Sequence, residues 1–127
     1  MTRYLSDTHT LLWYVTANPA LTAATRAVIQ DRENQVFISA ASIWEISIKQ
    51  RLGKMSPLPE EPDQLLSNAG LLKLDITVEH AMLAGQLPLL HRDPFDRMLV
   101  AQAQIENLIL ITHDEDIGKY DVPTLWL

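Results

Sequence analysis

Short apolar runs alternate with longer stretches of helical periodicity along most of this chain. The runs at 3–6, 35–39, 71–76 and 108–112 have the length and composition of buried strands, and a weaker run follows at 123–127. Between them, the spacing of apolar positions predicts helices at 10–16, 22–32, 40–52, 61–68, 78–86 and 95–106. Strands that alternate with helices predict an α/β fold with a mostly parallel sheet of four to five strands, covered on both faces.

The clearest interruption of this pattern is the stretch 54–62, which contains three prolines. Proline removes a backbone donor and breaks a helix interior, so this stretch is predicted to be a surface connection. A length of 127 residues without an internal repeat fits one domain, 1–127, that buries its own core.

Composition narrows the class of protein. The chain is 47% hydrophobic and 20% charged, as in ordinary globular proteins, and no segment approaches the roughly 18 apolar residues of a membrane span. The first residues enter a strand-like run at once, without the features of a secretory signal. The absence of cysteine excludes disulfides and thiolate metal sites and fits a reducing compartment. We therefore expect a cytoplasmic protein with no membrane partner.

The net charge of −6 argues at face value against a nucleic-acid partner, since such proteins usually carry a basic surface. Four of the negative charges, however, belong to acidic residues that the pattern directs to one end of the sheet: Asp7, Glu45, Asp96 and Asp114. Asp7 closes the first strand-like run and Asp114 follows the fourth, and strand ends are where α/β proteins bind ligands. A divalent cation held there would offset part of the repulsion.

Glu45 is the most informative of these acids. On a helical wheel it lies about 40° from Ala41, amid the apolar residues Trp44, Ile48 and Leu52. The opposite side is also apolar, so the helix is predicted to be buried nearly all round, where an unpaired carboxylate is costly. The alternative is a local ion pair with Lys49, four residues further along the helix.

Asp96 has a strong alternative interpretation as a helix-capping residue. Asp93 suits the N-cap position, Pro94 suits the first helical position, and Asp96 at the third can complete a capping-box-like pair. Its place in the first turn of a helix also holds it rigidly near the sheet's edge. We assign Asp93 to capping and to support of the site.

Asp7 and Asp114 have alternatives of the same kind. Asp7 can cap the helix that follows it. Asp114 can be one of three solvated acids with Glu115 and Asp116 at the start of a short helix. Each acid alone is ambiguous, but capping alone does not require all four acids to gather at one end of the sheet.

The donor set predicts which metal would bind. A site of carboxylate oxygens suits Mg²⁺ or Mn²⁺. The histidines at positions 9, 80, 91 and 113 lack a close ligand pair, so zinc is disfavoured and these residues are assigned to the surface or to support of the site. The aromatic residues Trp13, Tyr14 and Trp44 are assigned to the core, with the lining of a partner groove as the alternative for Trp13 and Tyr14. No glycine-rich phosphate loop is present.

Four segments that contain these acids, 5–13, 38–49, 91–103 and 110–114, together resemble PIN-domain ribonucleases of the VapC toxin type. The resemblance covers essentially the whole chain. It implies a three-layer α/β/α fold in which the first and fourth strands are neighbours and the four acids converge as catalytic metal ligands. It also implies a metal-dependent endoribonuclease in the cytoplasm, usually a homodimer, that hydrolyses RNA phosphodiester bonds and is neutralised by a small VapB-type antitoxin.

The resemblance also suggests supporting residues. Thr112 is similar to the family's hydroxyl at the edge of the site, and Asp116 is an alternative or additional metal ligand beside Asp114. Independently of the resemblance, the basic residues Lys49, Arg92 and Arg97 are candidates to position phosphate beside the four acids, with a salt bridge as the alternative for each.

Two other functions compete with this one. A receiver-type phospho-acceptor domain also has this length and an acidic site at strand ends, but here Asp7 is followed by Thr8 and the expected lysine near the end is missing. A catalytically silent PIN-like binding module would use the acids only to cap helices and to receive a basic partner.

Overall fold

The computed structural model describes residues 1–125 and contains five strands in one parallel sheet of order β3-β2-β1-β4-β5. The strands are β1 (Arg3–Ser6), β2 (Gln35–Ser39), β3 (Leu72–Leu74), β4 (Ile109–Ile111) and β5 (Thr124–Leu125). The first two have the predicted bounds, whereas β3 and β4 are shorter than predicted. The last two residues of the predicted run 123–127 lie outside the described residues.

In the part of the chain that the structure describes, six α-helices and one 3₁₀ helix connect the strands. They are α1 (Thr8–Val15), α2 (Ala23–Gln30), α3 (Ala40–Arg51), α4 (Pro62–Asn68), α5 (Val78–Gln86), α6 (Pro94–Glu106) and η1 (Ile117–Lys119). All six predicted helices are present, and α5 has the predicted bounds. Helix α1 begins two residues earlier than predicted, because Asp7 accepts a hydrogen bond from the backbone N–H of Thr10 and so caps the helix directly after β1.

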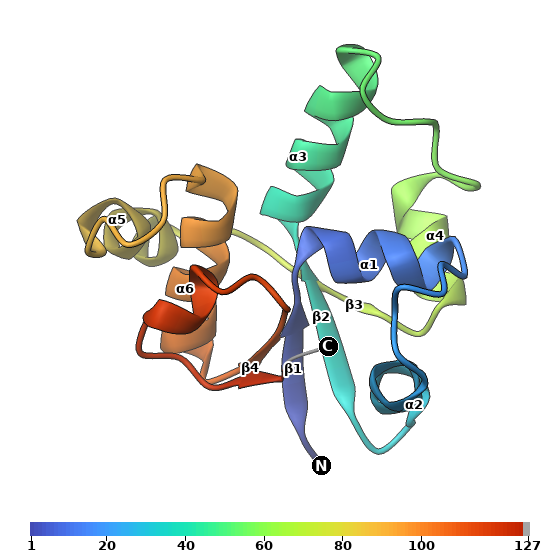
Figure 1. Cartoon of the computed structure of the whole chain (residues 1–127), viewed down its shortest axis with the longest axis horizontal. Coiled ribbons are helices and arrows are strands. Elements are labelled where there is room, and N and C mark those ends of the chain that lie inside the picture. Colours follow the sequence, from blue (N-terminus) through green and yellow to red (C-terminus); the bar gives the residue numbers. More distant parts are fainter. Residues whose placement is uncertain (126–127) are drawn as a thin grey trace.

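Helices cover both faces of the sheet, which confirms the predicted α/β/α layers. Figure 1 shows α5 and α6 on one side of the strands and α1, α2 and α4 on the other. Neighbouring residues of β4 point into different cores, as expected for a strand that is buried on both faces. Leu110 packs with Leu99 of α6, while Ile111 belongs to the core that contains Leu11 of α1 and Ile46 of α3.

Helix α3 differs from the prediction that it is buried nearly all round. Glu45 and Ile46 are buried, but Trp44 and Leu52 are each 61% exposed, and Ile48 is exposed as well. The wheel correctly groups residues that share a face, yet it does not say how far a neighbouring element extends over that face. Trp44 is therefore a surface residue and not a core residue; its ring contacts Phe95 edge-on, with ring centroids 5.2 Å apart.

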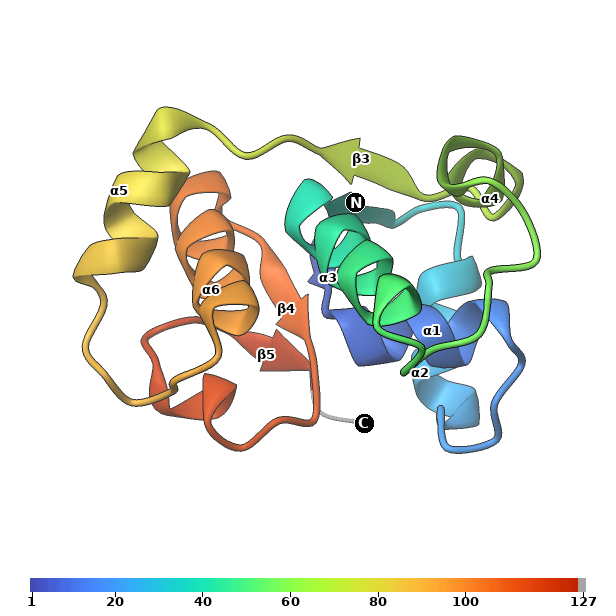
Figure 2. The same ribbon diagram turned by 90° about the horizontal axis from the view of Figure 1, so that it is seen from above.

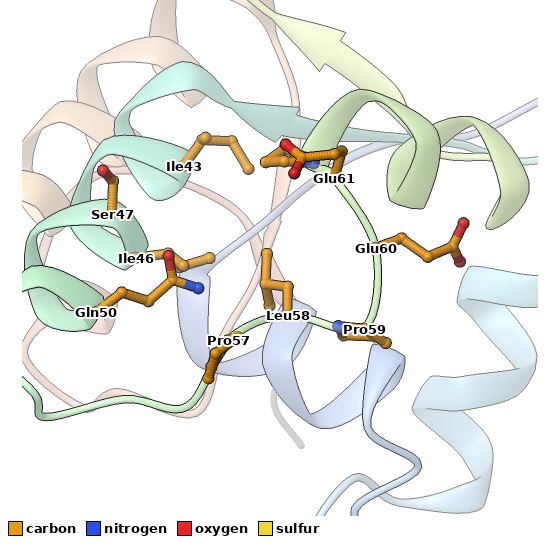
Figure 3. A pocket seen from close by; sticks show the side chains of 10 residues that line it. Ile43, Ile46, Ser47, Gln50, Pro57, Leu58, Pro59, Glu60 and Glu61 are labelled. Atoms are coloured by element: carbon orange, nitrogen blue, oxygen red, sulfur yellow. The ribbon is translucent and has the colours of Figure 1, made fainter.

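The proline-rich stretch is a surface connection between α3 and α4, as predicted. A hollow of about 550 Å³ lies between this connection and α3, and Figure 3 shows the Leu58 side chain rising from the connection toward the helix. The four predicted metal ligands are absent from its lining, so this hollow is separate from the acidic site.

Among the described residues, no helix combines the length and the apolar character needed to cross a membrane.

Candidate active site

The strand order brings the ends of β1 and β4 together. Strand β1 pairs with β2 on one side and with β4 on the other, so the chain changes direction across the sheet beside β1. The N–H of Asp7, directly after β1, donates to the carbonyl of Ile111, the last residue of β4, over 3.1 Å. Seen from above, helix α3 lies between α1 and α6, so all four acid-bearing segments surround one edge of the sheet (Figure 2).

Three side chains lie closest together at the carboxyl ends of β1 and β4. Nε2 of His91 lies 2.9 Å from Oδ2 of Asp96 and 3.2 Å from Oδ2 of Asp114. Within residues 1–125, these three residues form the group whose ligand atoms all lie within 4.8 Å of one another. Asp96 is largely buried, and Asp114 is 36% exposed on the solvent side. The arrangement therefore offers two convergent carboxylates and one imidazole.

The protonation of this group is shifted by its surroundings. Burial raises the pKa of Asp96 to about 7, and the negative charges of Asp93, Asp7 and Asp114 add to the effect although His91 opposes it. Burial alone would lower the pKa of His91, but Asp96 and Asp114 raise it above its ordinary value. Three like charges around Asp96 strongly favour the binding of a cation at the carboxyl ends of β1 and β4.

Asp7, the N-cap of α1, is one of the negative charges that raise the pKa of Asp96. Its side chain is buried, and Oδ1 accepts the capping bond from Thr10 at 2.8 Å. Only Oδ1 is engaged in a hydrogen bond within the described part of the chain. The capping alternative is thus correct for Asp7, and its second oxygen, Oδ2, stays available for a ligand.

Glu45 is hydrogen-bonded to the first turn of α1. The hydroxyl of Thr8 donates to Oε1 of Glu45 over 2.7 Å, and Nζ of Lys49 lies 3.0 Å from Oε2. The ion pair considered as the alternative for Glu45 is therefore present, and Lys49 is committed to it. Glu45 is outside the close group of His91, Asp96 and Asp114. Its link to the segment that carries Asp7 is the hydrogen bond from Thr8.

Thr112 and Asp116 have different relations to Asp114. Oγ1 of the buried Thr112 accepts from the N–H of Asp114 at 3.0 Å, and Oδ1 of Asp114 accepts from the N–H of Asp116 at 2.8 Å. These two bonds fix the Asp114 loop. The Asp116 carboxylate itself pairs with Lys119 at 2.8 Å and is not part of the close group.

Asp93 caps α6 as predicted. Its Oδ1 accepts from the N–H groups of Phe95 and Asp96 at 2.8 and 3.2 Å, and Pro94 occupies the first turn. The capping-box alternative for Asp96 is wrong, because the Asp96 carboxylate bonds to His91 while the N–H of Asp93 donates to Nδ1 of His91. The Asp96 carboxylate therefore does not cap α6 and is directed toward His91.

Arg97 differs from the ion-pair alternative considered for it. Its guanidinium is buried and donates to the carbonyls of Ala84, Leu87 and Pro88 at 2.9–3.0 Å. It also donates to the Tyr120 hydroxyl at 3.2 Å and, more weakly, to the carbonyl of His91 at 3.4 Å. These donors hold the segment before α6, and within residues 1–125 no carboxylate pairs with Arg97. The side chain therefore turns away from its neighbour Asp96.

His91 is the site residue that sequence reasoning missed, since it was grouped with the supporting histidines. Its only sequence signal is its position two residues before the Asp93 cap and five before Asp96. A single histidine in a loop has no ligand spacing to recognise. At the rim, His113 stacks on Trp13 with ring centroids 4.9 Å apart, which places an aromatic pair beside the Asp114 loop.

The donor set fits a hard divalent cation. Carboxylate oxygens dominate it, no thiol is present in the chain, and the low-dielectric surroundings of Asp96 favour added positive charge.

Comparison with known proteins places this site in context. A stretch of 33 residues is 58% identical to Ribonuclease VapC16 of Mycobacterium tuberculosis (strain ATCC 25618 / H37Rv), over 26% of this chain. The match spans only 23%, about a quarter, of the length of that relative.

Solved structures share the fold at low sequence identity. Chains in the crystal structures of VapBC2 from Rickettsia felis bound to a promoter DNA fragment and of FitAcB from Neisseria gonorrhoeae superpose with TM-scores of 0.68 and 0.64. Their identities are 15% and 19%, and the superpositions cover 98% and 96% of both chains in each pair. DNA-bound VapBC from Salmonella typhimurium is similar, with a TM-score of 0.65 at 16% identity over 98% of both chains.

The family model for the PIN domain matches residues 4–123, which include every predicted site residue. PIN-domain nucleases generally depend on a divalent metal, in agreement with the carboxylate group found here. The strand order, the acidic edge of the sheet and this match lead to one conclusion: the chain belongs to the PIN-domain family.

Proposed function

We propose that this chain is a metal-dependent endoribonuclease that hydrolyses RNA phosphodiester bonds, and that it acts as the toxin of a VapBC-type toxin–antitoxin system. The observation that carries the proposal is the convergence of Asp96 and Asp114, with Asp7 close enough to raise the pKa of Asp96, at the carboxyl ends of β1 and β4. The relative named Ribonuclease VapC16 supports the activity.

In this proposal, Asp7, Glu45, Asp96 and Asp114 are the catalytic residues and hold Mg²⁺ or Mn²⁺. The bound metal would lower the pKa of a coordinated water and stabilise the charge that develops on the phosphodiester. Oδ2 of Asp7 and the carboxylate of the largely buried Asp96 would serve as ligands, together with Asp114, which is more exposed to solvent. Asp116, paired with Lys119, is not needed as a ligand.

Other residues of the chain keep these carboxylates in place. Thr8 orients one oxygen of Glu45, and Lys49 balances the charge of the other. Thr112 fixes the backbone of Asp114, and Asp93 fixes the first turn of α6, which carries Asp96. Each contact restricts a carboxylate to one position, which reduces the reorganisation needed when cation and substrate bind.

The proposed partners are RNA as substrate, a small VapB-type antitoxin and a second copy of the chain. The low-identity structural neighbours include VapBC complexes, which supports the antitoxin as a partner of this chain. Exposed apolar side chains of α3, among them Trp44 and Leu52, support a homodimer, because such residues on one face usually mark an interface. We further propose a cytoplasmic location and a single PIN domain over 1–127.

The competing functions differ in what they require of the structure. The receiver-type interpretation is wrong: that fold places β3 beside β1 in the order 2-1-3-4-5, whereas here β4 is beside β1. A silent PIN-like binding module stays an alternative, because the Glu45–Lys49 ion pair and the Asp7 cap satisfy two acids without a metal. The assay below distinguishes it from the nuclease.

The test is cleavage of a labelled RNA pool by the purified chain with Mg²⁺, Mn²⁺ or EDTA. Asp96→Asn should abolish cleavage, whereas Asp116→Asn, which removes a carboxylate that pairs with Lys119, should retain it. Cleavage that survives EDTA or the Asp96→Asn change would not come from this metal site and would contradict the proposal. A chain that binds a VapB-type protein but cuts no RNA would support the silent module.

A further inference from the structure

We infer that the imidazole of His91 takes the place of a cation between Asp96 and Asp114 in the metal-free chain, and that it must leave this place before a divalent metal can bind both carboxylates. The inference rests on the metal site proposed above and adds a residue that controls access to it.

The position of the imidazole proton carries the argument. Nδ1 of His91 accepts a hydrogen bond from the backbone N–H of Asp93 at 3.3 Å, and a nitrogen that accepts carries no proton. The proton of the neutral ring is therefore on Nε2, which faces Oδ2 of Asp96 at 2.9 Å and Oδ2 of Asp114 at 3.2 Å. A polarised N–H thus points at both oxygens from the place where a shared cation would lie.

The same geometry argues against His91 as a metal ligand. Coordination through Nε2 would require a bare Nε2, which moves the proton to Nδ1. An Nδ1–H would then face the N–H of Asp93 across 3.3 Å, with two donors opposed and no acceptor between them. The loop that carries His91 is therefore arranged for a hydrogen-bond donor at Nε2.

The His91 ring can move away from Asp96 and Asp114 by rotation of the side chain alone. The backbone of His91 is held by other hydrogen bonds that do not involve the ring. The Tyr120 hydroxyl accepts from the N–H groups of Leu90 and His91 at 3.2 and 3.0 Å. Arg97 donates to Tyr120 and to the carbonyls of Pro88 and His91. Because Tyr120 and Arg97 hold the backbone of this loop, release of the ring breaks its bonds to Asp96, Asp114 and the N–H of Asp93 but leaves the loop in place.

This arrangement has two effects on the site. Without metal, the N–H offsets the repulsion between two neighbouring carboxylates, so the acidic loops stay together. Before metal can bind, the hydrogen bonds from His91 to Asp96 and Asp114 must break. The free energy of these bonds is therefore subtracted from the binding free energy of the metal. His91 is therefore a positioning residue that competes with the metal.

The test measures Mn²⁺ binding by the purified chain at fixed pH, by titration calorimetry or by the loss of the free-Mn²⁺ electron paramagnetic resonance signal. His91→Ala should bind Mn²⁺ about tenfold more tightly or better, since hydrogen bonds to charged groups are worth roughly that much. His113→Ala is the matched control: this histidine follows β4 beside Asp114 but stacks on Trp13, and its removal should leave the affinity unchanged. Asp96→Asn should weaken binding and so identify the site.

Weaker Mn²⁺ binding by His91→Ala would show that the imidazole is a ligand, and unchanged binding would show that it does not compete; either result overturns the inference. If His91→Ala melts below the assay temperature, His91→Ser is measured instead and read in the same way. RNA cleavage by the unaltered chain separates the two proposals, because a chain that cuts RNA but shows no tighter binding in the variant remains a nuclease without this competition. Absence of Mn²⁺ binding in every variant would overturn both.

Discussion

The hydroxyl of Thr8 donates a hydrogen bond to Oε1 of Glu45 over 2.7 Å, across the contact between the first turn of α1 and the middle of α3. Both residues are buried. The bond ties Glu45 to the residue that follows Asp7, so two of the four acids are placed relative to each other by one side chain.

Replacement of Thr8 by valine should therefore impair catalysis without unfolding the chain. Valine has nearly the same shape but no donor, so Oε1 of Glu45 loses its orienting partner while Lys49 still holds Oε2. Cleavage should fall by about 10- to 100-fold, as is typical when a residue that orients a metal ligand is lost. Thr16→Val removes only an exposed hydroxyl that bonds to the carbonyl of Leu12, and initial cleavage rates for this control should match those of the unaltered chain.

The stability of the metal-free chain should decrease as the pH rises through the neutral range. The pKa of Asp96 rises from 3.8 to about 7 on folding, so between these values the folded state binds more protons and loses stability as the proton leaves.

Melting temperatures in EDTA should thus be lower at pH 8 than at pH 5.5. Asp96→Asn carries no titrating group at that position, and its melting temperature should depend less on pH over the same interval. A larger pH dependence in Asp96→Asn than in the unaltered chain would show that another group is responsible.

Arg97 should matter for folding rather than for phosphate binding. Its removal leaves the carbonyls of Ala84 and Leu87 without their donors in a buried setting, and each such loss costs about 1–3 kcal/mol. Arg97→Met should lower the free energy of unfolding by about 3 kcal/mol in urea denaturation. Arg92→Met changes an exposed arginine five residues away and should stay within about 0.5 kcal/mol; equal losses in both variants would remove the structural role assigned to Arg97.

The cap of α6 should affect stability and activity together. Asp93→Ala removes the acceptor for the N–H groups of Phe95 and Asp96, which costs about 1 kcal/mol of stability. Because Asp96 lies in that first turn, cleavage should also fall even at temperatures where the variant is fully folded. Asp93→Asn preserves a side-chain oxygen and should recover most of the stability, and a variant pair that loses stability but keeps full cleavage would mean that the cap does not position Asp96.

Local patterns predicted the elements of this fold well because each depends on neighbours in sequence. The strands β1 and β2 and the helix α5 have the bounds that apolar spacing gave. The Asp93–Pro94 start of α6 followed from capping preferences alone. The predicted burial of Trp44 and Leu52 was wrong, because periodicity defines a face but not what covers it.

The residue types and their order along the chain were sufficient to indicate a parallel sheet and four candidate acids at one end of it. What the sequence left open was the distances between groups that are far apart in the chain. Only the tertiary structure shows that His91 is inserted between Asp96 and Asp114, and that Arg97 turns away from its neighbour Asp96. The physical reason is that side-chain direction and the pairing of distant loops depend on packing across the whole molecule, whereas helix caps and strand runs depend on a few adjacent residues.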